Sequence, residues 1–335
     1  MRPRVAVIGG GQNCEHEVSL ASAAAVARAL QDTDYDVVPL TIDTDGRWRQ
    51  GRAHPIDLAD AVRILRCCDV AVPVVHGPRG EDGTLAALCD LADVPCVGSS
   101  LRAGALAIDK WVTKLIAAAA GIATAPAVRL TAATAATYRW THPIVVKPVA
   151  AGSSKGVTLV QEPSGLPAAL RDALALDDRV LAEDVVAGRE IDVAVLGRPD
   201  GSRMVAPALE IVVDGLFDYE SKYGGHADLR IPAVLDEADH GALETAAVAM
   251  FDALGCAGVA RVDFFLTTDG PLLNEVNTMP GFTQHSQVPK MFAAAGIPYA
   301  KLLDLLVSDA LAAATGPSRE AASGRDQPLA SADHP

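Results

Sequence analysis

Short β-rich runs alternate with helical patterns through the first hundred residues. Four runs are rich in Val, Ile and small apolar residues, and segment 19–30, between the first two, has the apolar spacing of a helix. The runs are Val5–Ile8, Val37–Ile42, Val70–Val75 and Pro95–Val97. Strands that alternate with helices in this way form parallel βαβ units, because a parallel connection needs a crossover. We therefore predict a parallel α/β domain over residues 1–100, with ligand-binding loops at the carboxyl ends of its strands.

The pattern changes after residue 100, and two further units follow. A helix is expected at 108–120, and two strands, 143–149 and 157–160, flank a Gly/Ser-rich loop that forms a flap. A helix at 167–176 and a strand at 180–186 complete a middle unit over residues 101–187. The third unit, 188–315, contains a helix at 237–254, a hairpin at 259–276 and a last helix at 299–314. The polar, aperiodic tail 316–335 is expected to be disordered.

Charge and composition exclude several classes of function. Asp and Glu outnumber Lys and Arg by 42 to 28, so the net charge of −14 repels polyanions, and no nucleic-acid or anionic-membrane partner is expected. The longest apolar stretch, Leu115–Val128, is interrupted by Gly121 and Pro126 and falls short of the ~18 residues of a spanning helix, so no membrane span is expected. The six cysteines lack Cys-x-x-Cys spacing, which predicts reduced, buried thiols in a cytoplasmic protein.

The segment 261–277 carries the clearest chemical signal. Two β runs flank an Asp-Gly turn signal, so they form an antiparallel hairpin. With the turn centred on Asp269, Asp263 lies opposite Glu275 and Arg261 opposite Asn277, and the period of two places all four on one face. Two carboxylates and an amide oxygen are hard ligands that suit Mg²⁺, and Arg261 beside them can stabilise transferring phosphoryl charge. The alternative is a solvated polar face with a cross-strand ion pair.

Two other segments place polar groups in loops. Lys147 ends a β run and precedes the loop 152–156, whose backbone N–H groups suit phosphate, although a flexible hairpin loop explains the same pattern. No Walker A sequence occurs. Three glycines follow the first strand, but Cys14 stands where the dinucleotide fingerprint needs its last glycine, so NAD binding is not expected. Glu15, before a helix, either binds an ammonium group or is a carboxylate favoured by the helix dipole.

Taken together, these segments resemble the D-alanine–D-alanine ligases of the ATP-grasp superfamily. The resemblance extends to about residue 314 and depends on the joint, ordered occurrence of six segments. They are 10–19, 76–84, Asp109-Lys110, 144–156, 219–223 and 275–283. The resemblance implies an α/β (α+β) fold, in which an N-terminal parallel α/β domain is followed by a two-part ATP-grasp fold that grips ATP.

The activity that this resemblance implies is an ATP-dependent, ADP-forming ligation of two D-alanines for peptidoglycan precursors. One D-alanine carboxylate attacks the ATP γ-phosphate to give an acyl phosphate, and the amine of a second D-alanine displaces phosphate. Tyr223 is typical of family members that form a dipeptide. The alternatives are a ligase with another second substrate (D-serine, D-lactate or another amino acid) and a catalytically silent nucleotide-binding protein. The family also implies a homodimer.

By the same resemblance, the ATP site has a defined set of positions. Lys110 and Lys147 hold the phosphates, and the loop that closes over them contains Ser153 and Ser154. The partners of adenine and ribose are Glu183, the backbone at Val186, and Glu190. The two Mg²⁺ (or Mn²⁺) ions are held by Asp263, Glu275 and Asn277, in agreement with the metal site that the hairpin predicts.

The resemblance assigns the amino-acid sites in the same way. Glu15 pairs with the ammonium group of the first D-alanine, with His76 close by. The oxyanion is stabilised by Arg261 and the N–H of Gly281. Ser286 and Lys222 bind the carboxylate of the second substrate or the γ-phosphate, and the network Glu15, Ser153 and Tyr223 positions the incoming amine. Gln287 follows Ser286 at a position where a more apolar residue is common in the family.

Overall fold

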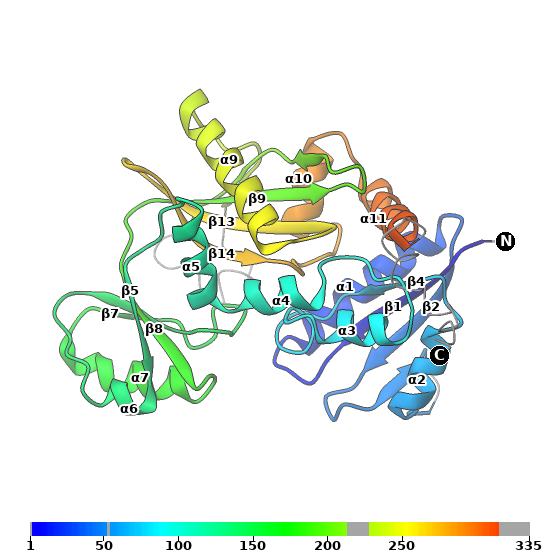
Figure 1. Ribbon diagram of the computed structural model, residues 1–335, viewed down its shortest axis with the longest axis horizontal. Coiled ribbons are helices and arrows are strands. Elements are labelled where there is room, and N and C mark those ends of the chain that lie inside the picture. Colours follow the sequence, from blue (N-terminus) through cyan, green and yellow to red (C-terminus); the bar gives the residue numbers. More distant parts are fainter. Residues whose placement is uncertain (1, 52–53, 213–227, 315–335) are drawn as a thin grey trace, which may run out of the picture.

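A parallel sheet forms the N-terminal part of the computed structural model, which describes residues 2–51, 54–212 and 228–314 (Figure 1). The sheet has the order β3-β2-β1-β4, with β1 parallel to both β2 and β4 and only β3 antiparallel. Its elements are β1 (Arg4–Gly10), α1 (His16–Gln31), β2 (Asp36–Ile42), β3 (Trp48–Gln50), α2 (Leu58–Leu65), β4 (Val70–Pro73) and α3 (Thr84–Leu91). The predicted α/β class is therefore confirmed.

The strand predicted at Pro95–Val97 is wrong. Only an isolated bridge joins Cys96 to Ala71 at the edge of the parallel sheet. Pro95 has no N–H to donate, and Gly98 follows with a φ of 101°, a left-handed conformation that turns the chain away from the sheet. The segment therefore makes a single bridge where a fourth parallel strand was expected.

The helix predicted at 108–120 is confirmed as α5 (Lys110–Ala119), and a helix that was not predicted, α4 (Leu101–Ile108), precedes it. Asp109 separates them with an extended backbone, and its Oδ1 accepts a hydrogen bond from the N–H of Val112 at 2.9 Å. Because Asp109 caps α5, Lys110 is the first residue of that helix. Its backbone N–H donates to Val149 O at 3.1 Å, which ties the helix to the next sheet.

A second, antiparallel sheet has the order β5-β8-β6-β7. Its elements are β5 (Ala127–Thr131), α6 (Ala132–Ala135), β6 (Ile144–Pro148), β7 (Thr158–Val160), the 3₁₀ helix Pro163–Gly165, α7 (Leu166–Leu174) and β8 (Arg179–Asp184). The strands β6 and β7 flank the Gly/Ser loop, as predicted, whereas β5 was not predicted. Leu170 and Ala173 of α7 pack on Val146 and Val180 of the sheet, and Figure 1 shows this unit at one end of the molecule.

The third sheet has the order β12-β11-β9-β13-β14, with β10 paired to β9. Its elements are β9 (Arg189–Gly197), β10 (Arg203–Val205), β11 (Leu209–Val212), β12 (Asp228–Arg230), α9 (Glu237–Leu254), β13 (Val259–Thr267) and β14 (Gly270–Asn277). Val262 and Phe264 point to the face that Phe251 of α9 covers. Because side chains alternate along a strand, Arg261 and Asp263 point to the opposite face. The helix thus buries the apolar side, and the polar side is left for ligands.

Two C-terminal helices join the third sheet to the first. They are α10 (Gln287–Ala294) and α11 (Tyr299–Ala314), and Phe292 and Leu303 share a core with Val72 of β4 and Leu30 of α1. Within the described ranges, no single helix is long and apolar enough to cross a membrane. The pair α10 and α11 meets that test on length and composition together, but the chain bends by 101° between them.

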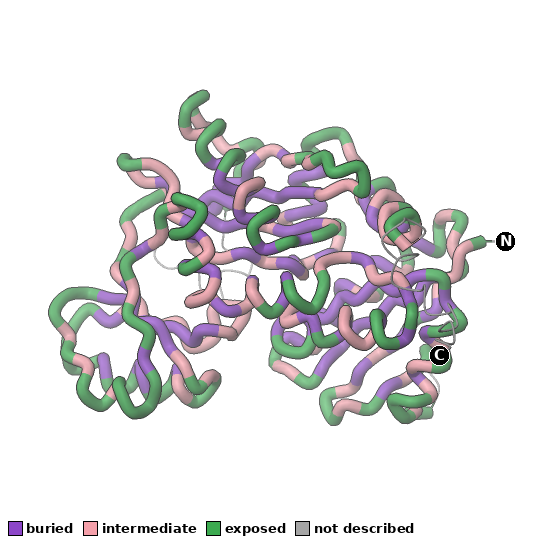
Figure 2. The backbone as a smooth tube through the Cα atoms, viewed as in Figure 1, coloured by how far each residue is buried: buried purple, intermediate pink, exposed green. Residues whose placement is uncertain are grey.

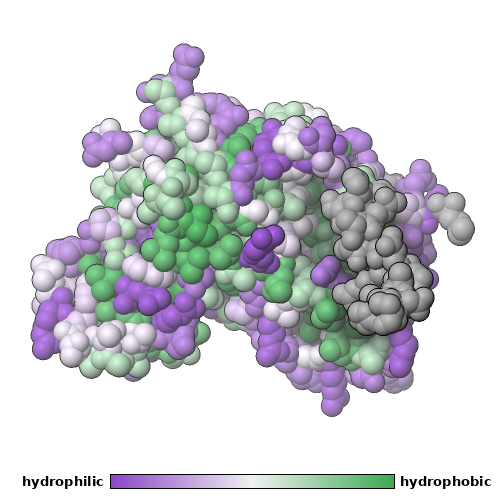
Figure 3. All heavy atoms as spheres, viewed as in Figure 1, coloured by the Kyte–Doolittle hydropathy of each residue, from purple (hydrophilic) through white to green (hydrophobic). Residues whose placement is uncertain are grey.

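Burial follows the layers of this fold. Figure 2 shows buried backbone along the central strands and exposed backbone along the outer faces of the helices. Figure 3 shows an apolar region on the viewed face near α5, where Leu115 is 53% exposed. The expectation of six buried cysteines holds for Cys68, Cys89 and Cys256, and Cys96 is half-buried. Cys14 and Cys67 are exposed, because the former lies in the loop before α1 and the latter follows the end of α2.

Candidate functional site

A cavity of ≈ 230 Å³ lies where the second and third sheets face each other. Ten of the residues that the sequence singled out line it: Lys110, Lys147, Ser153, Ser154, Glu183, Val186, Glu190, Arg261, Asp263 and Glu275. Apolar side chains, among them Val145, Val185 and Phe265, line another part of the wall. The cavity therefore combines a charged region with an apolar one, as a site for a nucleotide requires.

The register of the hairpin β13–β14 agrees with the sequence prediction at the functional end. Asp263 pairs with Glu275, and Arg261 pairs with Asn277. The predicted turn centre was wrong, because Thr267 pairs with Gly270 and the centre lies between Thr268 and Asp269.

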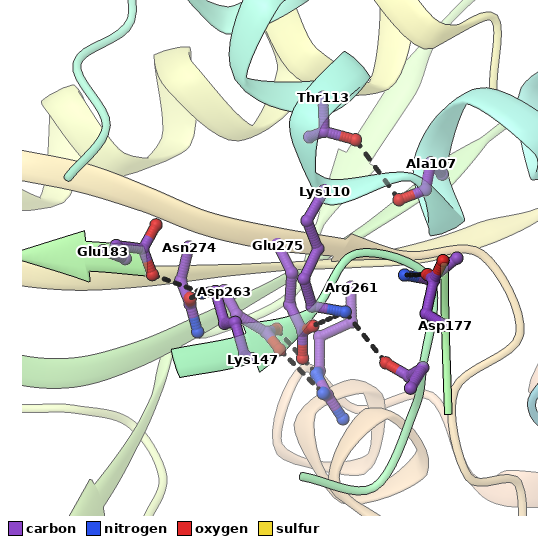
Figure 4. A network of polar contacts seen from close by, with 12 residues as sticks. Ala107, Lys110, Thr113, Lys147, Asp177, Glu183, Arg261, Asp263, Asn274 and Glu275 are labelled. Atoms are coloured by element: carbon purple, nitrogen blue, oxygen red, sulfur yellow. Dashed lines mark hydrogen bonds and ion pairs between the residues drawn. The ribbon is translucent and has the colours of Figure 1, made fainter. Parts of the chain in front are cut away.

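A β-bulge reconciles the two observations. Phe264 pairs with Leu273 and Asp263 with Glu275, so Asn274 is an extra residue in β14. The bulge shifts the register by one residue, and the acidic pair meets as predicted. It also turns Asn274 into the cavity, where its Oδ1 accepts a hydrogen bond from Lys147 Nζ at 3.1 Å (Figure 4).

The Arg261 guanidinium is buried among acidic and amide oxygens. Its Nε and one terminal nitrogen donate to the two oxygens of Asp263, both at 2.7 Å. Nε also lies 3.3 Å from Asp192 Oδ2, and the other terminal nitrogen donates to Gln287 Oε1 at 2.5 Å. Burial lowers the pKa of Arg261, but the carboxylates of Asp263 and Asp192 outweigh it and hold the pKa well above its ordinary value. Arg261 is a fixed positive charge.

Lys110 approaches the same cluster from the N-terminus of α5. Its Nζ forms an ion pair with Glu275 Oε2 at 3.1 Å and donates to Ala151 O at 3.0 Å (Figure 4). Burial lowers the pKa of Lys110, but the Glu275 carboxylate outweighs it, so the pKa lies above its ordinary value. The ammonium thus links the hairpin carboxylate to the Gly/Ser loop.

Glu183 is enclosed by two lysines at the other end of the cavity. Its carboxylate pairs with Lys147 at 2.5 Å and with Lys114, and the side chain is only 6% exposed. Burial raises the pKa of Glu183, but Lys147 and Lys114 outweigh it, and the pKa lies below its ordinary value. Burial lowers the pKa of Lys114 despite this partner. The pairing follows from register, because Val145 lies opposite Glu183, and Lys147, two residues on, shares their face.

Glu15 lies outside the cavity wall, beneath the Gly/Ser loop. Its side chain is buried, and Oε1 accepts a hydrogen bond from Ser153 Oγ. A Cβ at Gly152 would lie 2.7 Å from Glu15 Oε2, so the loop backbone passes directly over the carboxylate. Ser153 and Ser154 have φ angles of 51° and 54°, which gives the loop a sharp left-handed turn at this point. The structure therefore brings Glu15 and Ser153 together, as predicted.

His76 follows β4 and is fixed on both ring nitrogens. Nδ1 lies 2.8 Å from Met279 O, and Nε2 lies 3.0 Å from Ser22 Oγ. A carbonyl only accepts, so Nδ1 carries the proton and Nε2 accepts from the serine hydroxyl. Burial lowers the pKa of His76, and the ring is neutral. This imidazole orients the loop after β14 against the N-terminal sheet.

Glu81 is a carboxyl group that the sequence reasoning did not assign. Desolvation raises its pKa to about 8, and the charges of Glu15 and Glu275 add to the effect. Glu81 is therefore largely protonated at neutral pH. The charges of Glu15 and Glu275 thus reach Glu81, which is kept neutral.

The remaining predicted residues lie at the edge of the site or outside the description. Asn277 ends β14 and accepts from Met279 N at 3.0 Å, and Ser286 Oγ accepts from Thr283 N at 3.1 Å at the start of α10. Gly281 lies beside Ser286, since a Cβ there would be 3.2 Å from its Oγ. None of these three lines the cavity. Lys222 and Tyr223 fall outside the described residues, as does the tail 316–335.

Four residues to which the sequence analysis gave no role also contribute to the site. The sequence features that could have identified them differ. Lys114 lies one turn after Lys110 on α5, so helical spacing could have found it. Asp192 lies opposite Asp263 on β9, which only long-range register reveals. Asn274 depends on the bulge, and Gln287 on the position of α10 against β13.

The donor set suits a hard cation that also binds phosphate. Among the described residues, no three His, Cys, Asp or Glu side chains gather into a metal-binding group. Mg²⁺ commonly takes one or two carboxylates and completes its shell with water and substrate phosphate. Asp263 and Glu275, each already beside a cation of the protein, with the amide of Asn277 nearby, fit that requirement.

Comparisons with known proteins agree with this geometry. A family model described as "D-ala D-ala ligase C-terminus" matches residues 116–308, and one described as "D-ala D-ala ligase N-terminus" matches residues 4–63 and 52–99. A D-alanine–D-alanine ligase of Mycolicibacterium vanbaalenii is 38% identical, over 94% of this chain and 99% of that protein.

Solved structures give the same result. The VanG D-Ala:D-Ser ligase from Enterococcus faecalis is 33% identical with a TM-score of 0.80, over 92% of this chain and 100% of that one. The D-alanine–D-alanine ligase from Bacillus anthracis complexed with ATP is 28% identical with a TM-score of 0.77, over 93% and 98%. The two facing sheets are those of the ATP-grasp class. The chain belongs to the D-alanine–D-alanine ligase family, which confirms the resemblance seen in the sequence.

Proposed function

We propose that this chain is an ATP-dependent, ADP-forming D-alanine–D-alanine ligase that supplies the dipeptide of peptidoglycan precursors. The observation that carries the proposal is the cavity in which Lys110, Lys147 and Arg261 face the carboxylates of Asp263 and Glu275. A carboxylate attacks polyanionic ATP slowly unless fixed positive charges offset the repulsion. Fixed cations beside two hard-ion ligands are what phosphoryl transfer from ATP to a carboxylate requires.

The nucleotide occupies the cavity between the two sheets. Lys110 and Lys147 hold its phosphates, and the loop with Ser153 and Ser154 closes over them. The adenine lies against the apolar wall, with the Glu183 carboxylate and the backbone of Val186 as partners, and Glu190 binds the ribose. Lys114 supports this arrangement by keeping Glu183 ionised.

The hairpin carboxylates hold two Mg²⁺ (or Mn²⁺) ions together with Asn277. The ions neutralise phosphate charge when they are bound. Arg261 and the N–H of Gly281 stabilise the oxyanion that forms when the second amine attacks the acyl phosphate.

The amino acids bind on the side of the cavity that faces the N-terminal sheet. Glu15 pairs with the ammonium group of the first D-alanine, with His76 nearby to fix the loop after β14. Ser286 and Lys222 bind the carboxylate of the second substrate or the γ-phosphate. Glu15, Ser153 and Tyr223 form the network that positions the incoming amine.

The decisive experiment combines the purified protein with ATP, Mg²⁺ and D-alanine, with D-serine, D-lactate and L-alanine as parallel second substrates. ADP release is followed, and the product is identified by mass spectrometry. D-alanyl-D-alanine is the expected dominant product. A mixed product transfers the assignment to a ligase with another second substrate, such as D-serine, on which the similar VanG enzyme acts. No turnover with any pair contradicts the ligase assignment and favours a silent nucleotide-binding protein.

Sedimentation analysis of the same preparation tests the homodimer that the resemblance implies. A single species at twice the monomer mass is expected. A monomer would contradict this part of the proposal.

The Glu15 assignment gives a specific prediction. Glu15→Gln keeps an acceptor for Ser153 but removes the charge, so kcat/KM for D-alanine falls by about 10–100-fold, the value of a charge-assisted hydrogen bond. Glu17→Gln is the matched control: Glu17 is an exposed residue of α1, the helix that Glu15 precedes, and its change leaves kcat/KM unchanged. Steady-state kinetics at saturating ATP measure both, and equal values for the two variants would remove Glu15 from the substrate site.

A further inference from the structure

Arg261 contacts two further residues besides Asp263, the proposed metal ligand. Asp263 occupies Nε and one terminal nitrogen, at 2.7 Å each. Asp192 Oδ2 lies 3.3 Å from Nε, and Gln287 Oε1 accepts a hydrogen bond from the remaining terminal nitrogen at 2.5 Å. These partners come from three elements, β13, β9 and the start of α10. The guanidinium is thus held from three sides.

The contacts between Arg261 and Asp263 weaken when a cation binds Asp263 in the proposed reaction. Each oxygen of Asp263 accepts one hydrogen bond from Arg261, and a cation that binds the remaining lone pairs of this carboxylate competes with the guanidinium for the same negative charge and weakens these contacts. The Arg261 side chain is only 11% exposed, so a loss of its counter-ion would leave a buried charge unpaired, which is costly. Some other group must keep the guanidinium in place.

Asp192 and Gln287 meet that requirement. Asp192 is 2% exposed and lies directly opposite Asp263 in the β9–β13 ladder, on the same face of the sheet. It supplies a second negative charge. Because Asp192 is not one of the proposed cation ligands, this charge stays with Arg261 when a cation binds. Gln287, the first residue of α10, supplies a neutral acceptor that sets the direction of the guanidinium plane.

We propose that Asp192 and Gln287 are positioning residues that retain Arg261 when a divalent cation draws Asp263 away. This inference builds on the proposed function, because it takes Asp263 as a cation ligand. Asp192 makes the release of Asp263 easier and so strengthens cation binding without touching the ion. Gln287 carries no charge and acts on the aim of Arg261.

The test for Asp192 is a titration of the full chain with Mn²⁺ in the presence of ADP, with free Mn²⁺ followed by electron paramagnetic resonance. Asp192→Asn is expected to weaken Mn²⁺ binding about tenfold, as the loss of an outer partner of a metal ligand typically does. Asp269→Asn, which neutralises an exposed carboxylate at the turn of the same hairpin, outside the cavity, is the control and changes the affinity by less than about twofold.

A double-mutant cycle identifies the route of the effect. In an Arg261→Gln background, Asp192→Asn is expected to change Mn²⁺ affinity by less than about twofold, because its effect passes through Arg261. This double variant removes one positive and one negative charge, so it also serves if Asp192→Asn alone is poorly folded. A tenfold loss that persists in this background would make Asp192 a ligand or a general field source and overturn the proposal.

Gln287 has a different expected signature. Gln287→Leu lowers kcat about tenfold and leaves the Mn²⁺ affinity and the KM for ATP unchanged, because orientation of an oxyanion donor affects the transition state. Gln287→Glu retains the acceptor oxygen and restores kcat to within about threefold. Equal losses in the two variants would overturn this part of the inference. Wild-type protein that binds no Mn²⁺ would contradict the proposed metal site and the inference together, whereas normal Mn²⁺ binding by Asp192→Asn overturns the inference alone.

Discussion

Asp263→Asn and Glu275→Gln are each expected to lower kcat about a thousandfold, which corresponds to ~4 kcal/mol of transition-state stabilisation. Each change replaces a carboxylate by an amide of the same shape, so the cation loses a charged ligand while the hairpin keeps its packing. ADP release with D-alanine at saturating Mg²⁺ measures the effect.

The control for this prediction lies in the same hairpin. Asp269→Asn changes an exposed residue at the turn and is expected to keep wild-type kcat, since it lies outside the cavity. Thermal unfolding of all three variants shows whether a loss reflects the site or the fold. Near-normal activity in both Asp263→Asn and Glu275→Gln would refute the metal assignment.

Glu183→Gln is expected to lower the free energy of unfolding by about 3–5 kcal/mol, because it leaves two buried ammonium groups without their counter-ion. Lys114 and Lys147 are each 7% exposed and both pair with this carboxylate. Urea unfolding at neutral pH measures the loss. Asp184→Asn, the next residue on the strand, whose His142 partner is half exposed, is expected to cost less than about 1 kcal/mol. Equal costs for the two variants would contradict the prediction.

The same group gives a pH dependence with a definite sign. The folded-state pKa of Glu183 lies below its ordinary value of 4.5, so the stabilisation by the carboxylate is complete above that pH. It is lost as the pH falls through the folded-state pKa. The difference in unfolding free energy between wild type and Glu183→Gln should therefore narrow as the pH is lowered from about 7 to about 3. A difference that stays constant over this range would contradict the assignment.

Local patterns in the sequence were sufficient for much of the fold. The helices α9 and α11 begin and end at the predicted residues, because Asp236 and Gly255 bound the first and apolar periodicity defines the second. The alternation of strands and helices predicted the parallel sheet. Glu15 and Ser153, 138 residues apart, were joined through family resemblance and not through spacing.

Other features depend on long-range packing and had no local signal. Asp192 reaches the site only because β9 pairs with β13 in one particular register. Gln287 contacts Arg261 because the loop after β14 places the start of α10 beside the hairpin. The helix α4 was not predicted, and Asp109, which lies between α4 and α5, caps the start of α5 with a hydrogen bond.

The bulge in β14 has a consequence for how this strand tolerates change. A regular strand gives every second side chain to a face, but the extra residue lets Asn274 and its neighbour Glu275 serve the same cavity. Without Asn274, Leu273 would still lie opposite Phe264 and Glu275 opposite Asp263. Deletion of Asn274 therefore removes the amide that Lys147 contacts, while both flanking pairs keep their partners. The number of polar side chains that β14 gives to the cavity can thus change without a change in its register with β13.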